Sequence, residues 1–242
     1  MTDSAQSLSV LHVDTAMEWR GGQQQLLYLI DGMVKRGCRV AVATPPDSPL
    51  SRRLDPGVER VDIGVGVHPK TALTLRAAMR RGQFDVMACH TAPGHSVAAV
   101  VGLPTVVHRR VDFAVGTNPW SRWKYSQGQR FVAVSDGVAR VLMAAGVSAD
   151  VIDVVYDGVP QLESQSPAPD LIQDRPLIGA IGALVGHKAH HLLVSAIQRC
   201  PNVDCVIVGE GPLRKALEDQ IAELDLANRV RLIGYREDIA AV

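Results

Sequence analysis

Short apolar runs alternate along the chain with longer segments in which apolar residues recur at helical spacing. The runs are nearly continuous in Val, Ile, Leu and Ala, which is typical of parallel strands buried on both faces. This alternation predicts a doubly wound α/β domain over residues 1–158. Its predicted strands are Leu8–Asp14, Arg39–Thr44, Val58–Ile63, Phe84–His90, Thr105–His108, Arg130–Val134 and Val151–Val155. Its predicted helices are Gln23–Arg36, Leu73–Arg81, Gly94–Val101 and Asp136–Ala145.

A second α/β unit is predicted after a break in this pattern. Residues 159–175 are rich in Pro, Ser and Gln and have no periodicity, which indicates an interdomain linker. The pattern resumes over residues 176–242 with strands and helices at Leu177–Ile181, His190–Arg199, Asp204–Val208, Pro212–Leu224 and Arg229–Ile233. So few strands rarely make a free-standing Rossmann-like sheet. We therefore interpret this domain as incomplete and the sequence as a fragment.

Composition narrows the class of protein. The 242 residues are 47% hydrophobic and carry no formal net charge, so we expect no nucleic-acid partner. The polar start lacks the features of a signal peptide, and no apolar run approaches the roughly 18 residues that cross a bilayer. We therefore expect a soluble, cytoplasmic protein. Reduced, buried thiols are expected at all four cysteines, which form no CxxC pair: Cys38, Cys89, Cys200 and Cys205.

Paired glycines, Gly21 and Gly22, lie between the first strand and the first helix. Glycine lets a ligand approach the backbone closely, and the helix N-terminus that follows suits phosphate. The spacing is not GxGxxG, and Thr44 stands where a dinucleotide site needs an acidic residue. The alternative is a tight strand-to-helix turn without a ligand.

The second unit has two similar loops. Gly182, Gly186 and Lys188 lie between its first strand and helix, where a lysine can pair with a diphosphate. No P-loop spacing is present. Glu210 and Gly211 lie in the next strand-to-helix loop.

Taken in order, five short motifs resemble glycosyltransferase family 4. They are Trp19-Arg20-Gly21-Gly22-Gln23, Val134-Ser135-Asp136-Gly137-Val138, Tyr156-Asp157-Gly158-Val159, His187-Lys188-Ala189-His190 and Val208-Gly209-Glu210-Gly211-Pro212-Leu213. Each motif is weak alone, but together they span nearly the whole chain. The resemblance implies the GT-B fold, in which two Rossmann-like domains face each other.

The resemblance also implies an enzyme: a hexosyl or other glycosyltransferase that acts with retention on a nucleotide-sugar donor and needs no metal or other cofactor. A glycan or a lipid-linked molecule would be the acceptor, in cell-surface polysaccharide or lipopolysaccharide synthesis. By position, Gly21 and Gly22 would bind the donor, with Gly22 close to its phosphates or to the acceptor, and Lys188 would hold the diphosphate. Glu210, Gly211 and Leu213 would flank the nucleotide.

Candidate catalytic residues follow from the end of one first-domain strand. The family commonly places a histidine there, near the transferred sugar. Arg110 occupies that position here, and His108 lies two residues earlier on the same strand face. Either side chain would contact the sugar or the diphosphate, or would simply close the end of the strand. Arg109, which lies between them, is a possible acceptor or cleft residue.

Two further candidates adjoin the acceptor side of the predicted site. His90 ends another strand, where open α/β sheets bind ligands, and His95 follows it closely. Ser135 belongs to a family motif, although its position favours an N-cap that accepts from N–H groups around Gly137. Metal ligation is not expected, because the histidines lack HExxH or other zinc spacing.

The sequence departs from the family at three places. Ala183 stands where the family often has arginine, and Ala189 replaces a glycine. The family's spaced pair of glutamates, which grips the donor ribose and sugar, is absent and is expected beyond Val242. We therefore expect this fragment alone to be inactive. The alternatives are a non-catalytic nucleotide- or glycan-binding remnant and a sugar-nucleotide epimerase on the same fold.

Aromatic and basic residues gather between Phe113 and Tyr125, where Trp123 lies between Arg122 and Lys124. This segment is interpreted as amphipathic packing on the sheet or as an acceptor or lipid-headgroup surface. The second interpretation places the protein at the periphery of the inner membrane surface.

Overall fold

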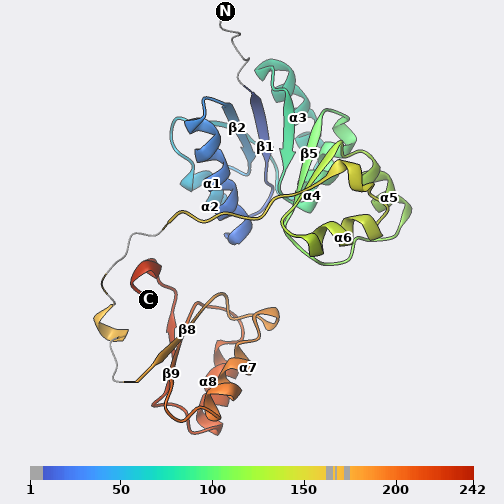
Figure 1. Ribbon diagram of the computed structural model, residues 1–242. Helices are drawn as coiled ribbons and strands as arrows, with labels where there is room; N and C mark the ends of the chain where they lie inside the picture. Colours follow the sequence, from blue (N-terminus) through green and yellow to red (C-terminus); the bar gives the residue numbers. More distant parts are fainter. Residues whose placement is uncertain (1–7, 162–165, 167, 172–174) are drawn as a thin grey trace, which may run out of the picture. The chain divides into compact units, whose positions relative to one another are not determined.

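The computed structural model describes residues 8–161, 166, 168–171 and 175–242, and the chain divides into two compact units, residues 1–159 and 160–242. The first unit contains a parallel sheet in the order β3-β2-β1-β4-β5-β6-β7 (Figure 1). Its strands are β1 (Ser9–Val13), β2 (Arg39–Thr44), β3 (Glu59–Asp62), β4 (Val86–Cys89), β5 (Thr105–Arg109), β6 (Arg130–Ala133) and β7 (Ile152–Val154).

Helices connect these strands, as the alternating pattern predicts. They are α1 (Gly21–Lys35), α2 (Pro49–Arg53), α3 (Pro69–Gly82), α4 (Ala92–Val101), α5 (Pro119–Ser126) and α6 (Asp136–Ala144), with a 3₁₀ turn at Ala149–Val151. The sequence pattern missed α2, which is too short to show a period, and α5. A recognisable signal marks the start of α5, because the Asn118 side chain accepts from Ser121 N and Pro119 follows it.

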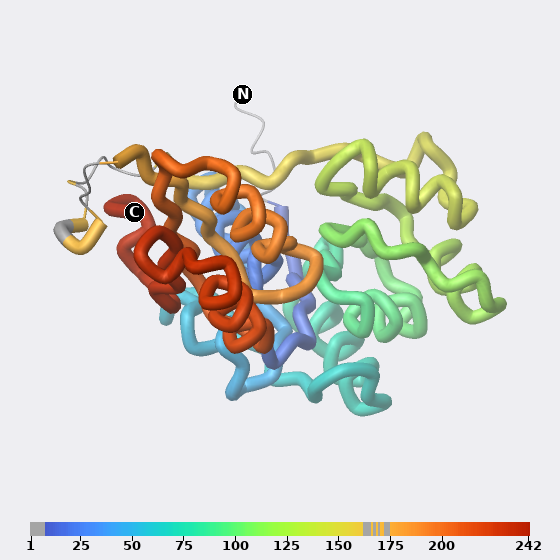
Figure 2. Tube along the Cα trace, turned by 90° about the horizontal axis from the view of Figure 1, so that it is seen from below, coloured from blue at the N-terminus to red at the C-terminus, as the bar shows by residue number. Residues whose placement is uncertain are grey.

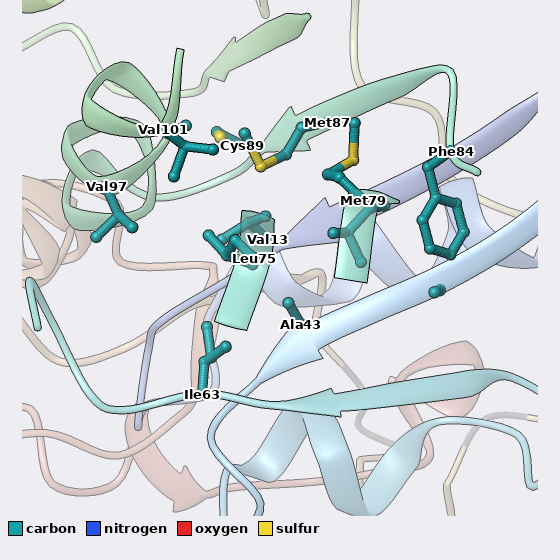
Figure 3. Close-up of a cluster of buried hydrophobic side chains, with 13 residues drawn as sticks. Val13, Ala43, Ile63, Leu75, Met79, Phe84, Met87, Cys89, Val97 and Val101 are labelled. Atoms are coloured by element: carbon teal, nitrogen blue, oxygen red, sulfur yellow. The ribbon is translucent and has the colours of Figure 1, made fainter. Parts of the chain in front are cut away.

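Alternate residues of the central strands supply hydrophobic clusters on opposite faces of this sheet. Ala41 and Ala43 of β2 pack with α3 and α4, whereas Val40 and Val42 pack with α1 and α2. Figure 3 shows the first of these clusters, in which strand and helix side chains interdigitate: Val13, Ala43, Ile63, Leu75, Met79, Phe84, Met87, Cys89, Val97 and Val101. Burial on both faces fixes the strand register, so the polar side chains at the strand ends are placed reproducibly.

The second unit contains a smaller parallel sheet in the order β10-β9-β8. Its strands are β8 (Leu177–Ile181), β9 (Asp204–Val208) and β10 (Val230–Gly234). Helices α7 (His190–Gln198) and α8 (Arg214–Glu223) lie side by side and pack on the sheet (Figures 1 and 2). The remaining turns are 3₁₀ helices at Pro169–Leu171, Gly186–Lys188 and Ile239–Ala241.

The predicted linker, residues 159–175, is only partly described, because residues 162–165, 167 and 172–174 lie outside the described part of the chain. Within the rest, Ala168 and Leu171 are buried against Val206 of β9. The buried-thiol prediction holds for Cys89 and Cys205 but is wrong for Cys200, which is exposed, and Cys38 is half-buried. No helix among the described residues combines the length and apolar character needed to cross a membrane.

Close backbone packing, not ligand approach, explains two glycines of the second unit. Gly209 has φ +142°, and a Cβ there would clash with the carbonyl oxygen of Gly182. A Cβ on Gly211 would lie 2.8 Å from Leu184 N, where real Cβ atoms do not fit. The loops that follow β8 and β9 therefore touch directly, backbone against backbone.

We predict that Gly209→Ala destabilises the second unit by about 1–3 kcal/mol, because the new Cβ adds steric clash to a backbone conformation that L residues rarely adopt. Gly179→Ala, in β8, is the matched control, since its Cβ would meet nothing within 4 Å. Thermal unfolding followed by circular dichroism measures both. Equal unfolding temperatures for the two variants would contradict the packing explanation.

Candidate functional site

The carboxyl ends of β1, β4 and β5 meet at one edge of the first sheet. Strand register pairs Val13 with Cys89 and Cys89 with Val107, so the residues that follow these three positions are neighbours. A pocket of about 390 Å³ lies there. Its lining is Ala16, Glu18, Arg20, Gly22, Gln23, His90, Thr91, Ala92, His95, Val107, His108, Arg109, Arg110, Val111 and Tyr125.

Three imidazole rings form a stack at this edge, because His12, His90 and His108 share one sheet face. The His90 and His108 rings stack with centroids 4.4 Å apart and planes 24° apart. The His12 and His90 rings are 5.1 Å apart, and His12 Nδ1 lies 2.9 Å from His90 Nε2. His12 is only 1% exposed. Sequence reasoning identified His90 and His108 but missed His12, although its place near the carboxyl end of a strand was the available signal.

Arg110 lies beside this stack and is held on two sides. Its Nη1 is 3.2 Å from His90 Nδ1, and its Nε is 3.2 Å from Asp157 Oδ1. Its side chain is only 16% exposed. The structure therefore brings the candidates Arg110, His108 and His90 together but gives the guanidinium protein partners. Asp157, which sequence reasoning placed in a motif but not in the site, holds Arg110 from beyond β7.

Burial sets the protonation of the rings. Burial, followed by the charge of Arg110, lowers the pKa of His12 to about 4 and that of His108 to about 3. Burial also lowers the pKa of His90 well below its usual value, with further lowering by His108, His12 and Arg110. His95, which contacts Tyr125 edge-on, has a pKa of about 3, mainly because it is buried. All four rings are therefore neutral at pH 7.

We predict that the first unit loses stability as the pH falls from 7 to 5. Unfolded histidine titrates near 6.5, so between that pH and the lowered folded pKa values the unfolded chain binds more protons. Each of the four rings with a lowered pKa then contributes at most about 1.4 kcal/mol of lost stability per pH unit. Asp14, whose pKa burial raises, opposes this trend only below its own pKa.

Urea unfolding followed by tryptophan fluorescence reports on the first unit, which contains all three tryptophans: Trp19, Trp120 and Trp123. The control is His191→Gln, an exposed position on α7 in the second unit, which contains no tryptophan. A stability that stays constant or rises from pH 7 to pH 5 would show that the rings are not neutral in the fold.

The glycine turn before α1 is held by a buried carboxylate. Asp14 accepts hydrogen bonds from Ala16 N at 2.8 Å and from Gln23 Nε2 at 2.9 Å. Gln23 Oε1 in turn accepts from Arg20 N at 3.1 Å. Gly21 and Gly22 follow as the first residues of the helix, and a Cβ on either would meet nothing within 4 Å. These hydrogen bonds thus hold the turn in place, and there is free space beside Gly21 and Gly22. Gly22 lines the pocket.

Two other first-unit candidates have structural partners. Arg109 lines the pocket, but its guanidinium donates to Tyr125 Oη at 2.8 Å and to the carbonyl oxygen of Phe113. Ser135 caps α6 and accepts from Val138 N at 3.3 Å, which confirms the predicted N-cap one residue beyond Gly137. Ser135 is not among the residues that line the pocket.

The predicted donor residues of the second unit lie on its two neighbouring loops. Lys188 is exposed and ends the 3₁₀ turn after β8, and its aliphatic stem passes 3.6 Å from the position of a Cβ on Gly182. Glu210 pairs with Arg214 at 2.9 Å. Gly211 packs on Leu184, as described above. Leu213 is half-buried against the hydrophobic cluster of α7 and α8.

Ala189 is strained by its position. Its φ of +53° and ψ of +31° are left-handed, a conformation that costs an L residue about 1–2 kcal/mol and that glycine adopts freely. We predict that Ala189→Gly stabilises the second unit by about 0.5–1 kcal/mol. Ala196→Gly, in the exposed interior of α7, is the control and should destabilise it by about 1 kcal/mol. Hydrogen exchange of the α7 amides measures both; the same sign for both would contradict the assigned strain.

Within the described ranges, no group of three or more His, Cys, Asp and Glu side chains is placed to hold a metal ion. The candidate site residues form two sets, one in each unit. The first unit offers neutral ring nitrogens beside a paired guanidinium, and the second offers an exposed ammonium group on a loop.

Comparison with known families decides the membership. The sequence pattern of glycosyltransferase family 4 matches residues 19–161, more than half of the chain. The chain belongs to glycosyltransferase family 4. Residues 163–242 match a second pattern, that of the group 1 glycosyl transferases. Both patterns describe transferase enzymes, which confirms the resemblance drawn from the five motifs.

Solved structures confirm the GT-B-like fold of this family 4 chain. HepE of Anabaena in complex with UDP superimposes with a TM-score of 0.79 at 19% identity, covering 97% of this chain and 71% of HepE. A glycosyltransferase from Rickettsia africae gives 0.78 at 18% identity, covering 97% of this chain and 70% of that one.

One curated relative is similar in sequence. The lipopolysaccharide core biosynthesis glycosyltransferase LpsE of Rhizobium meliloti is 32% identical over 69 residues. This match covers 28% of the family 4 chain and only 20% of the length of LpsE.

Proposed function

We propose that this protein transfers a sugar from a nucleotide-sugar donor to a hydroxyl group of a glycan or lipid-linked acceptor, with retention of configuration and without a metal or other cofactor. The observations that carry the proposal are an exposed lysine loop in one unit and a ring-lined pocket in the other, within a family of glycosyltransferases. The two sites suit the two halves of such a donor.

The nucleotide diphosphate is assigned to the second unit. Lys188 is exposed, and no ion pair to it is found within the described residues, so its ammonium group is available to a phosphate. Negative charge grows on the diphosphate as the sugar leaves, and a fixed cation stabilises that charge. The structures of HepE with UDP and with UDP-glucose support a nucleotide-sugar donor of this kind.

The sugar is assigned to the pocket of the first unit. His108 makes no side-chain hydrogen bond to the described residues, and its neutral ring can accept from one hydroxyl and donate to another. Arg110 is already paired with Asp157, which makes it a poorer ligand for the diphosphate than its sequence position implies. We therefore propose His108 as the residue that contacts the transferred sugar.

The acceptor is proposed to belong to cell-surface polysaccharide or lipopolysaccharide synthesis. The name of the LpsE relative supports this assignment. A lipid-linked acceptor also fits helix α5, where Trp120 and Trp123 pack together and remain 49% and 40% exposed beside Arg122 and Lys124. Such an aromatic and basic surface suits a headgroup layer, so we propose a cytoplasmic protein that works at the inner membrane surface.

We predict that Lys188→Ala weakens nucleotide-sugar binding about 10- to 100-fold, since a charged hydrogen bond contributes about 1.5–3 kcal/mol. Lys215→Ala is the matched control, because Lys215 is equally exposed on α8 but pairs with Asp219. Calorimetric titration with a nucleotide sugar and a turnover assay measure the effect.

Three outcomes separate the alternatives. Loss of both binding and turnover in Lys188→Ala, with Lys215→Ala unaffected, supports the transferase. Binding without turnover in the natural protein would favour a nucleotide- or glycan-binding remnant. Epimerisation of the donor sugar without its transfer would favour an epimerase. Unchanged binding in Lys188→Ala would remove this lysine from the donor site.

A further inference from the structure

Four side chains form one connected series of hydrogen bonds, and two of them, His90 and Arg110, line the pocket. Asp157 Oδ1 meets Arg110 Nε at 3.2 Å, Arg110 Nη1 meets His90 Nδ1 at 3.2 Å, and His90 Nε2 meets His12 Nδ1 at 2.9 Å. These residues come from the segment after β7, from the ends of β5 and β4, and from β1. This series of hydrogen bonds therefore links three adjacent strands of the first sheet, β1, β4 and β5, to the segment that follows β7.

The hydrogens that each side chain carries determine which atom donates and which accepts in every one of these hydrogen bonds. A guanidinium can only donate, so His90 Nδ1 must accept from Arg110 and carries no hydrogen. A neutral ring whose Nδ1 is bare carries its hydrogen on Nε2, so His90 donates to His12 Nδ1. His12 then carries its own hydrogen on Nε2. A protonated His90 would place an N–H against the Arg110 donor, so this contact excludes the imidazolium form.

We propose that Arg110 is a positioning residue that fixes His90 and His12 as Nε2–H tautomers and so holds the ring of His108 in place. His108 depends on this series of hydrogen bonds because its ring stacks on His90. Its own nitrogens bond to none of the described side chains, so stacking is the contact that orients them. The tautomers are assigned from the hydrogen bonds of the protein alone. The effect of His108 on the transferred sugar rests on the proposed function.

The same geometry shows what an arginine supplies at this position. The guanidinium uses one edge nitrogen, Nε, for Asp157 and another, Nη1, for His90, so a single planar group spans both partners. A lysine offers one nitrogen and cannot hold that arrangement at both distances. Asp157 is 35% exposed and lies three residues before Pro160, where the second unit begins. Its carboxylate therefore anchors the guanidinium from outside the sheet.

The test is long-range ¹H–¹⁵N correlation spectroscopy of the full-length protein labelled at histidine, which distinguishes a protonated ring nitrogen from a bare one. We expect bare Nδ1 and protonated Nε2 on both His90 and His12 at pH 7. A hydrogen on Nδ1 of His90, or a doubly protonated His90 ring, would overturn the proposal without any substitution being made.

Two variants then isolate the role of the guanidinium. Arg110→Met removes the donor and should give His90 a mixture of tautomers, whereas Arg110→Lys should keep the donor and largely preserve the bare Nδ1. Arg130→Met is the matched control, since Arg130 pairs with Asp153 across β6 and β7 away from the pocket. Unchanged His90 signals in Arg110→Met would overturn the proposal.

Kinetics test the consequence for His108 separately. Arg110→Met should lower kcat about 10- to 100-fold while the KM for the nucleotide sugar changes little, because the diphosphate is held by the other unit. If the tautomers change but kcat does not, the link between the ring stack and the sugar is wrong. If the tautomers stay fixed and turnover is absent even in the natural protein, the proposed function fails while the positioning role stands.

Discussion

A single guanidinium shares a buried space with three imidazole rings, and this is possible only while the rings stay neutral. Protonation of His90 would place a second donor against Arg110 and a second positive charge beside the guanidinium. Asp157 supplies the opposite charge that Arg110 needs. The neutral rings that line the pocket therefore offer directional hydrogen bonds, beside three arginines that also line it: Arg20, Arg109 and Arg110. Such a surface is suited to hydroxyl groups.

The second unit offers positive charge on an exposed side chain. Lys188 is exposed at the end of a loop that is held in place by backbone contact between Gly182, Gly209 and Gly211 and their neighbours. These glycines act through packing, so their presence in a family motif does not by itself show contact with a ligand. The proposed function assigns the charged diphosphate to the lysine of the second unit and the hydroxyls of the sugar to the rings of the first.

Periodicity was sufficient to predict the sheet strands, because burial on both faces leaves an unmistakable apolar run such as Arg39–Thr44. The strand ends suggested His90 and the family resemblance suggested His108, and the structure stacks these two rings. His12 was missed because a histidine in an apolar strand looks structural until the strand order places it beside β4. Asp157 could not be connected to Arg110 at all, since a contact across 47 residues leaves no local pattern.

The central claim, that phosphate is bound by the second unit and sugar by the first, is tested most directly by NMR titration of the full-length protein with UDP and then with UDP-glucose. The account predicts that UDP shifts the backbone amides around Lys188 and leaves the His108 ring unchanged, whereas UDP-glucose shifts both. A His108 ring that responds equally to UDP alone, or a Lys188 loop that responds to neither ligand, would contradict it.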